Sequence, residues 1–522
     1  MSTKIVVKHN HYRDSVFLMV IDQQARTLRG VHETAVMMGT DNNKDIIREV
    51  GFSGADIDSA SPNDLILCVR GQSDSAVEAA LAQMEEMLTR KPTPRELEDE
   101  YKTLDAALRE RPSCNLALIS VPGQFAAREA RKALHRGLNV LLFSDNVTLD
   151  EEVELKRLAL SLDRIVMGPD CGTAIINQVP LAFANAVPPG PIGIVAASGT
   201  GLQEVVCQLA GEGLGITQAV GVGGRDLSDG VGGISTIKAL EVLEEDAATR
   251  VIVVVSKPPG PATMERMLQR ISESDKEVIV CFLGADIGVM SRRGVAAAGS
   301  LEEAARMAAC TVKGVSYTPR DFTFPKEKIE SIVARETRHM AGSQRFVRGL
   351  YSGGTLCYEA MIILSGLVGD VYSNIPLKDK LWIPNPPTGV KHTCIDLGDD
   401  YFTKGKPHPM IAPETRNRYI REQAADEEVG VLLLDVVLGY GSHRDMAGAL
   451  SESIRAAKSS VETRGGYLSV IASVCGTAED PQGLDSQVEK LESCGVVVMP
   501  SNAQAARLAA MVLKAHSVRG AR

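Results

Sequence analysis

From residue 115 onward the chain alternates short, almost purely aliphatic runs with segments that have the apolar spacing of a helix. Aliphatic runs of this kind are typical of parallel strands buried on both faces, and the helices between them supply right-handed crossovers. We therefore predict an α/β fold with several parallel sheets. The runs expected to form strands are Leu116–Ser120, Val140–Phe143, Ile165–Met167, Ile192–Ala196, Gln218–Val222, Val251–Ser256, Val278–Phe282, Phe346–Leu350, Gly430–Val437, Leu468–Ser473 and Val496–Met499.

The length of 522 residues suggests about three to five domains, at roughly 100–200 residues each. Shorter strand and helix signals before residue 90 indicate a small N-terminal α/β domain. Residues 370–417 have no regular pattern and are expected to form a long irregular insertion. The expected divisions are a small α/β domain at 1–90, a charged linker at 91–112, parallel-sheet domains at 113–188 and 189–325, a linker at 326–344 and a third parallel-sheet domain at 345–522.

Composition excludes several classes of protein. The net charge is −10 and aromatic residues make up 4%, which argues against a basic or base-stacking nucleic-acid binder. No apolar run is long enough for a membrane span and the first residues do not resemble a signal peptide, so we expect a cytoplasmic protein. The ten cysteines form no C-x-x-C pair, which favours reduced, buried thiols and no metal site.

Two segments look like copies of one strand–turn–helix unit. ASGTGLQE at Ala197–Glu204 and YSGGTLCYE at Tyr351–Glu359 share a Ser-Gly turn, a following Leu and a Glu. Each turn is expected to place backbone N–H groups and a hydroxyl at a helix N-terminus, where an anion is favoured. The alternative for each turn is an ordinary strand-to-helix loop with a Ser cap.

A third turn of the same type follows the aliphatic run that ends at Val437. In LGYGSHRD, Gly439 and Gly441 permit close approach of the backbone and Ser442 offers a hydroxyl. Because ligands bind at the carboxyl ends of parallel strands, we predict an anion site that uses several of these turns. The residues predicted to bind phosphate are Ser198, Gly199, Thr200, Gly201, Gly439, Gly441 and Ser442.

Two further residues are candidates for catalysis. Arg225 lies in the glycine-rich loop GGRDLSDGVGG and has the geometry to clamp a carboxylate or phosphate; the alternative is a surface salt bridge. His408 lies between two prolines, which suits a general acid or base, or a hydrogen-bond donor to a carbonyl. Asp399 and Asp400 precede it in the same stretch and are candidates to hold a metal or to position a cationic or amide group. The alternative, favoured for any one of these residues, is a solvated loop with a capping aspartate.

The motifs together resemble a known family. Gly168–Thr173 (GPDCGT) and Ile192–Glu204 resemble segments of the succinyl-CoA synthetase α subunit, and Leu432–Asp445 resembles the carboxyl domain of the β subunit. Nearly the whole chain resembles the FdrA family, a fused relative of those two subunits. This resemblance implies a CoA-binding-like Rossmann domain at 113–188 and flavodoxin-like domains of α type at 189–325 and of β type at 345–522.

The departures from the synthetase are informative. The segment before Asn115 has no glycine-rich loop of the kind that holds CoA in the α subunit, and the chain has no P-loop or G-x-S-x-G motif. The region that corresponds to the phosphohistidine segment reads MSRRGVAAAGS, at Met290–Ser300, without a histidine, and the ATP-grasp half of the β subunit is missing. The resemblance thus implies a retained phosphate site without the ATP and phosphohistidine steps.

Three functions remain open at this stage. The first is a subunit of oxamate carbamoyltransferase, which the FdrA resemblance implies: oxalurate and phosphate give oxamate and carbamoyl phosphate at the end of allantoin breakdown. The second is an acyl-CoA synthetase resembling succinate–CoA ligase, and the third is a non-catalytic binding subunit. We expect phosphate or carbamoyl phosphate as substrate, further protein subunits and an oligomer as partners, and no metal; CoA binding is left open.

Overall fold

The computed structural model describes residues 1–11, 13, 15–26, 28–89, 101–384, 388–403 and 406–520. Its contacts divide the chain into two compact units. The smaller unit is residues 1–109 with 404–407, and the larger is residues 110–403 with 408–522.

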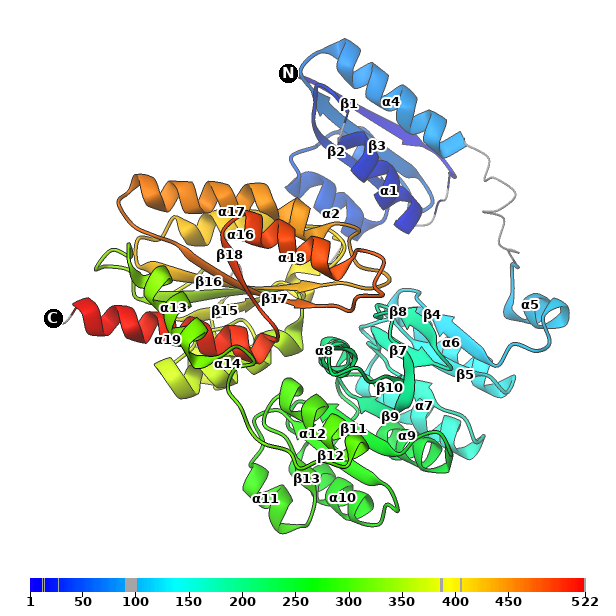
Figure 1. Cartoon of the computed structure of the whole chain (residues 1–522). Helices are drawn as coiled ribbons and strands as arrows, with labels where there is room; N and C mark the ends of the chain where they lie inside the picture. The colour runs from blue at the N-terminus through cyan, green and yellow to red at the C-terminus, as the bar shows by residue number, and fades with distance from the viewer. Residues whose placement is uncertain are drawn as a thin grey trace. The chain divides into compact units, whose positions relative to one another are not determined.

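The smaller unit is a three-stranded antiparallel sheet in the order β1-β3-β2 (Figure 1). Alternate residues of the central strand face two separate cores: Leu65, Leu67 and Val69 lie in one, and Ile66 and Cys68 in the other. Helices therefore cover both faces, as the predicted small α/β domain requires. Its elements are β1 (Ser2–Lys8), α1 (Ser15–Arg26), β2 (Val31–Met38), α2 (Asp41–Glu49), α3 (Ala55–Ser59), β3 (Leu65–Gly71) and α4 (Asp74–Thr89).

The larger unit begins with a three-stranded parallel sheet in the order β4-β5-β6. The helix after its second strand starts with a capping box, in which Thr148 and Glu151 satisfy each other's backbone N–H groups. The predicted Rossmann-like βαβ pattern is confirmed here. The division between the two units falls within α5 (Leu104–Glu110). The elements that follow are β4 (Leu116–Ile119), α6 (Gly123–His135), β5 (Asn139–Leu142), α7 (Leu149–Ser161) and β6 (Val166–Met167).

A seven-stranded sheet follows, in the order β13-β12-β11-β9-β10-β7-β8. Its first two strands in sequence, β7 (Thr173–Ile176) and β8 (Val179–Ala182), form a hairpin that pairs antiparallel with β10. The expected division at residue 188 therefore falls after a hairpin that already belongs to this sheet. The other elements are β9 (Pro189–Ala196), α8 (Gly199–Gly211), β10 (Ile216–Gly221), α9 (Ile234–Glu245), β11 (Val251–Ser256), α10 (Pro261–Ser272), β12 (Glu277–Phe282), α11 (Ile287–Arg292), β13 (Ala296–Ala297) and α12 (Leu301–Lys313).

The third sheet of the larger unit, called the third sheet below, is wholly parallel, in the order β15-β14-β16-β17-β18. The three-stranded parallel sheet and the seven-stranded sheet are likewise the first and second sheets. Its edge strand β15 comes from the stretch expected to be an irregular insertion, so that expectation is wrong. The elements are α13 (Lys326–Thr337), β14 (Phe346–Tyr351), α14 (Gly354–Val368), the 3-10 turn η1 (Asp379–Leu381), β15 (Thr393–Asp396), α15 (Asp400–Thr403), α16 (Glu414–Ala424), β16 (Val429–Val437), α17 (Met446–Thr463), β17 (Ser469–Cys475), α18 (Leu484–Ser493), β18 (Val496–Met499) and α19 (Asn502–Gly520).

One continuous core joins the second and third sheets through α8, α12, α14 and α19. The two copied motifs make reciprocal contacts inside it. Glu204 of α8 accepts a hydrogen bond from the backbone N–H of Asn502 at 3.3 Å, and Glu359 of α14 accepts one from Leu301 at 2.7 Å. Glu204 thus caps α19, and Glu359 caps α12, so each glutamate caps the last helix that follows the other copy of the motif. This reciprocal arrangement supports the duplication seen in the sequence. Burial, and then the charge of Glu359, raise the pKa of Glu204 to about 8.

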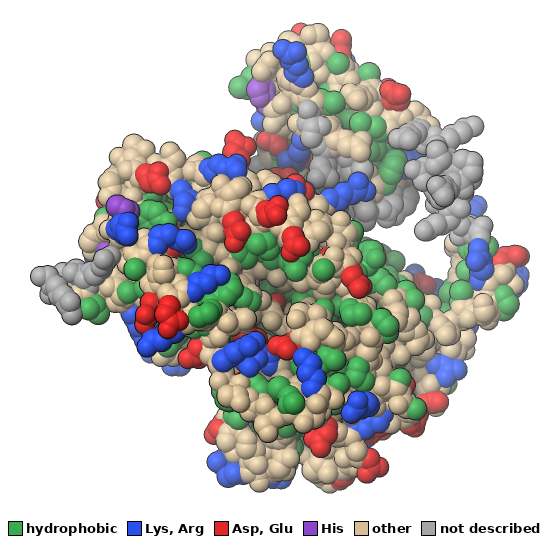
Figure 2. Space-filling model, viewed as in Figure 1, with side chains coloured by type: hydrophobic (Ala, Val, Ile, Leu, Met, Phe, Trp, Pro, Cys, Tyr) green, Lys and Arg blue, Asp and Glu red, His purple; other side chains and the backbone are tan. Residues whose placement is uncertain are grey.

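Charged side chains of both signs are interspersed on the face seen in Figure 2. Eight of the ten cysteines are buried, Cys114 is exposed and Cys310 is half-buried; all ten are free thiols. None of the helices among the described residues is long and apolar enough to cross a membrane.

Candidate functional site

The first turns of α8 and α14 lie against each other. Ser198 is the N-cap of α8: its Oγ accepts the N–H of Gly201 at 2.9 Å and donates to Oγ1 of Thr355 at 2.6 Å. The N–H of Thr355 in turn points to Oγ1 of Thr200 at 3.4 Å. Gly199 and Thr200 occupy N1 and N2, whose N–H groups have no acceptor inside the helix. Two helix N-termini therefore present donors and hydroxyls at one place.

The turn before α14 is held by a buried aspartate. Asp435, at the end of β16, accepts the N–H of Ser352 at 2.8 Å, its hydroxyl at 3.0 Å and the N–H of Gly353 at 2.7 Å. Arg416 pairs with the same carboxylate at 3.1 Å, and both side chains are fully buried. The ion pair between Asp435 and Arg416 thus holds the turn between β14 and α14 in place.

Gly439–Ser442 occupies a different position from the one expected. The following helix α17 begins at Met446, and its N-cap is Asp445, which accepts the N–H of Gly448 at 3.0 Å. The expectation that this turn leads directly into a helix N-terminus is therefore wrong, because three residues separate the two and a carboxylate caps the helix.

The contacts of the Gly439–Ser442 turn lie with the segment after β8. Tyr440 pairs with Ala184 as an isolated β-bridge, and a Cβ on Gly441 would lie 2.9 Å from the Phe183 ring. The Gly439–Ser442 turn thus packs against the segment between β8 and β9, whereas the first turn of α8 contacts Thr355. Phosphate binding by Gly439, Gly441 and Ser442 stays a prediction.

Asp396 and His408 lie close to the first turn of α14 and to the Ser352 turn that precedes it. A Cβ on Gly354 would meet Oδ2 of Asp396 at 2.6 Å, and a Cβ on Gly398 would meet Nε2 of His408 at 2.7 Å and the Ser352 carbonyl at 2.9 Å. Neither glycine therefore tolerates a side chain, and both let polar groups approach the Ser352 turn.

The protonation of these two side chains follows from burial. Burial raises the pKa of Asp396 to about 7, opposed by the N–H of Gly398 and the charge of Lys257. Burial lowers the pKa of His408 to about 4, so the ring is neutral at pH 7. Its Nδ1 accepts the N–H of Met410 at 3.2 Å, which leaves the proton on Nε2. The sequence prediction of a hydrogen-bond donor at His408 is compatible with this arrangement.

A third carboxyl belongs to the same electrostatic neighbourhood. Burial, with the charges of Asp145 and Asp400, raises the pKa of Asp170 to about 6, and Arg225 and Lys257 oppose the shift. Asp170 follows β6, Lys257 follows β11 and Asp400 follows β15. The carboxyl ends of strands from all three sheets thus contribute charged groups. Thr355, Lys257 and Asp170 were not predicted as site residues, although Thr355 lies in the copied motif.

Arg225 is half-exposed and already paired. It donates to Glu152 at 3.0 Å and to the carbonyl of Val147 at 2.8 Å, which corresponds to the salt-bridged loop considered as the alternative. Its neighbour Asp226 is fully buried and accepts the N–H of Thr236 at 2.9 Å. A catalytic role for Arg225 stays a prediction.

Replacing Asp396 by asparagine should make stability less dependent on pH. The pKa of Asp396 is about 7 in the folded protein, against an ordinary value of 3.8, so the folded protein holds this proton more tightly than the unfolded chain. The proton therefore adds to the free energy of unfolding; this contribution is complete below about pH 4 and is lost as the pH rises through 7. An asparagine side chain at this position cannot ionise. Between pH 5 and pH 8 the variant should gain up to ~3 kcal/mol relative to the natural protein, at about 1.4 kcal/mol per pH unit.

Urea unfolding followed by the fluorescence of Trp382, the single tryptophan, measures this gain. Asp485→Asn, at an exposed position of α18, is the control and should show no such change. Parallel pH profiles of Asp396→Asn and the natural protein would contradict a neutral Asp396.

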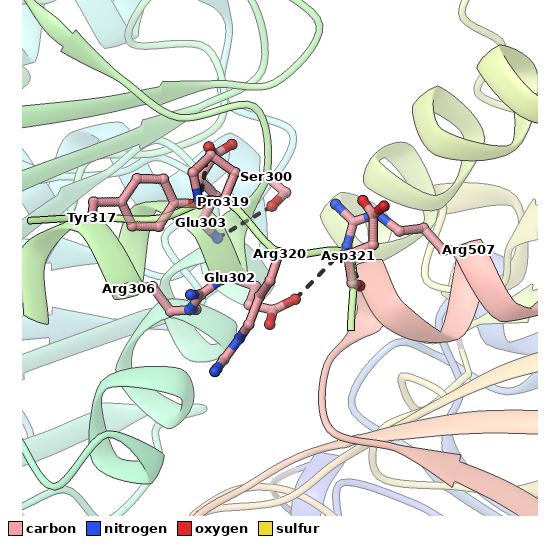
Figure 3. A pocket seen from close by; sticks show the side chains of 9 residues that line it. All are labelled: Ser300, Glu302, Glu303, Arg306, Tyr317, Pro319, Arg320, Asp321 and Arg507. Carbon is pink, nitrogen blue, oxygen red and sulfur yellow. Dashed lines mark hydrogen bonds and ion pairs between the residues drawn. The ribbon is translucent and has the colours of Figure 1, made fainter. Parts of the chain in front are cut away.

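A separate cavity of about 280 Å³ lies at the start of α12 (Figure 3). Its arginines are already engaged: Arg507 lies 3.9 Å from Glu302 and 3.7 Å from Asp321, and Arg320 lies 3.6 Å from Glu212. Arg306 donates to the carbonyl of Thr318 and lies over the Tyr317 ring. This cavity therefore offers an anion less unpaired charge than the strand ends do.

Comparison with known proteins identifies the family. Residues 350–512 match the family described as CoA-ligase, and residues 1–103 match the one described as AllF, heavy metal-associated domain. Over 510 residues the chain is 42% identical to the uncharacterized protein YahF of Escherichia coli strain K12, and the match covers 98% of each chain. The chain belongs to the FdrA family.

This FdrA-family chain is also related to CoA ligases. It is 29% identical over 197 residues to the ADP-forming succinate–CoA ligase subunit alpha of Staphylococcus epidermidis, which covers 37% of this chain and 63% of that one. Among solved structures it is similar to the apo form of the dinucleotide-forming acetyl-coenzyme A synthetase 1 of Ca. Korarchaeum cryptofilum. That likeness has 17% identity and a TM-score of 0.31, and covers 78% of this chain and 84% of the other.

The heavy metal named in the N-terminal family description does not fit the residues present. Cys68 is the single cysteine of residues 1–103. It is buried in β3, and burial raises the pKa of its thiol to about 12, so no thiolate is available as a ligand. Nor do the described residues contain a cluster of three or more His, Cys, Asp or Glu side chains arranged for a metal.

Proposed function

We propose that this chain is a subunit of an enzyme that transfers a carbamoyl or acyl group to or from phosphate. The observation that carries the proposal is the 2.6 Å hydrogen bond between Ser198 and Thr355, which joins the first turns of α8 and α14. Both helix dipoles, together with the N–H groups of Gly199 and Thr200 in the first turn of α8, favour an anion at that point. Phosphate and carbamoyl phosphate are anions of the size that two such turns can hold.

The reaction that we favour is the one associated with the family: oxalurate and hydrogen phosphate give oxamate and carbamoyl phosphate. A phosphate oxygen forms the new bond to the ureido carbon, the C–N bond breaks, and the proton of hydrogen phosphate ends on the oxamate nitrogen. A carboxyl with a pKa of about 7, such as Asp396, can carry that proton at neutral pH. The Nε2 proton of His408 is available to a carbonyl oxygen.

Two further expectations from the sequence, a phosphate contact by Arg225 and additional protein subunits, are part of this proposal. Arg225 would clamp the phosphate after exchanging its contact with Glu152, and further protein subunits would supply what this chain lacks. The second candidate is an acyl-CoA ligase, favoured by the match of residues 350–512 to the CoA-ligase family and by the succinate–CoA ligase relative.

Removing the hydroxyls that join the two turns should weaken phosphate binding. Ser198→Ala and Thr355→Val each delete one hydroxyl, worth about 0.5–1.5 kcal/mol if neutral and about 1.5–3 kcal/mol if it contacts a charged group. We expect a fall in affinity of roughly threefold to a hundredfold for phosphate and carbamoyl phosphate. Calorimetric titration of the full chain, with partner subunits added if required, measures it.

Ser459→Ala, at an exposed position of α17, is the matched control. Gly441→Val is a poorer test, because Gly441 has φ +80° and its Cβ would strike Phe183, so packing and binding would change together. Unchanged phosphate affinity in Ser198→Ala and Thr355→Val would reject this site. Acyl-CoA formation from acid, CoA and ATP by the isolated chain would establish the ligase instead.

A further inference from the structure

A cavity of about 540 Å³ lies beside the candidate site. It is built from three parts of the larger unit: the turn after β11, the second turn of α14 and the segment that leads from α14 to β15. The residues that line it are Lys257, Tyr358, Ile375, Pro376, Asp379 and Trp382.

Three observations place this cavity next to the first turns of α8 and α14, where phosphate is proposed to bind. Tyr358 lies three residues after Thr355 on α14, so the two side chains are on neighbouring parts of one helix face. Asn374, which directly precedes Ile375, exchanges two 2.9 Å hydrogen bonds with the backbone of Asp396. The charge of Lys257 also acts on both Asp396 and Asp170.

The side chains of the cavity offer complementary contacts to one kind of ligand. Within the described part of the chain no carboxylate lies within 4 Å of the Lys257 ammonium, which sits 5.2 Å from the centroid of the Tyr358 ring. Trp382 is 56% exposed, an unusual position for an indole, and Asp379 is exposed on the same rim. One ammonium group, one carboxylate and two aromatic rings thus surround a single space.

We propose that this cavity is where the organic partner of the proposed reaction binds, as a small planar carboxylate with an amide N–H of the kind that oxalurate and oxamate are. Lys257 pairs with the carboxylate, Asp379 accepts the N–H, and the rings of Tyr358 and Trp382 cover the planar face. The inference rests on the proposed function, since it assigns the second substrate of that same site.

Trp382 is the single tryptophan of the chain, so its fluorescence reports occupancy of the cavity directly. Oxamate is the probe, titrated into the full chain with and without saturating phosphate, and equilibrium dialysis of labelled oxamate gives a second readout. We expect saturable binding, weakened at least about tenfold in Lys257→Gln, as loss of a charge-assisted contact implies.

Lys380→Gln is the matched control, because Lys380 is exposed on the same segment and does not line the cavity. Pyruvate, which lacks the N–H, should bind more weakly than oxamate to the natural protein, and Asp379→Ala should narrow that difference. Absence of oxamate binding by dialysis, or equal affinity in Lys257→Gln and Lys380→Gln, overturns the assignment.

The two proposals fail separately. Oxamate binding that depends on Lys257, without phosphate binding at Ser198 and Thr355, would reject the phosphate-linked function and keep the cavity as a carboxylate site. Phosphate binding that depends on Ser198 and Thr355, with oxamate binding indifferent to Lys257, would reject the cavity alone.

Discussion

Asp435→Ala is expected to destabilise the third sheet by about 3–5 kcal/mol, because it leaves a buried charge without its partner. Arg416 would remain fully buried with no carboxylate at its guanidinium, and burial already lowers the pKa of this arginine. The N–H groups of Ser352 and Gly353 would lose their shared acceptor as well. Because these groups fix the turn before α14, phosphate affinity should fall together with stability.

The fluorescence of Trp382 during urea unfolding reports on this region, since Trp382 lies between β14 and β15. Asp435→Asn keeps an acceptor for the turn and loses only the charge, so its loss should be smaller. Glu452→Ala, at an exposed position of α17, is the control and should change stability by less than about 0.5 kcal/mol. If Asp435→Ala unfolds like Glu452→Ala, the ion pair does not hold the turn.

Lys156→Met is expected to cost about 3–5 kcal/mol in the region where the first two sheets meet, again by leaving buried charge unpaired. The Lys156 ammonium is fully buried and lies 2.7 Å from both Glu152 and Asp226. Asp226 also accepts the N–H groups of Ser235 and Thr236 at the start of α9. Without the cation, buried Asp226 would lose its ammonium partner and face Glu152, which would keep its ion pair with Arg225.

Hydrogen exchange of α7 and β10 measures this loss locally, because Trp382 lies in the segment between β14 and β15 and does not report on this region. Arg157→Ala is the matched control: the residue is next on the same helix and exposed. Exchange rates in Lys156→Met equal to those in Arg157→Ala would show that the buried cluster contributes nothing to stability.

Which strands form is readable from the sequence wherever a strand is buried on both faces. The run Val251–Ser256 is an example: its aliphatic residues predict a strand, and it forms β11. The hairpin of β7 and β8 and the edge strand β15 were missed, because each strand has only four residues and its aliphatic run is broken. Pro180 interrupts β8, and Thr393 and Asp396 stand at the two ends of β15. Their pairing with distant strands is a tertiary property.

The candidate site was only partly predictable for a related reason. A Ser-Gly turn after an aliphatic run indicates a helix N-terminus, and this holds for Ser198. Which turn faces which depends on how the two sheets pack, so the partner of Ser198 proved to be Thr355. Spacing also failed to separate Ser442 from the true cap Asp445, since both are good capping residues within four positions.

The burial of α19 has a consequence for truncation of the chain. Its apolar face, including Ala506, Leu508 and Val512, is completely buried in the core shared by the second and third sheets. That core also holds residues of α8, α12 and α14, so this one helix covers apolar surface that belongs to both sheets. A truncation before Asn502 would therefore expose that apolar surface, and we expect the shortened protein to aggregate.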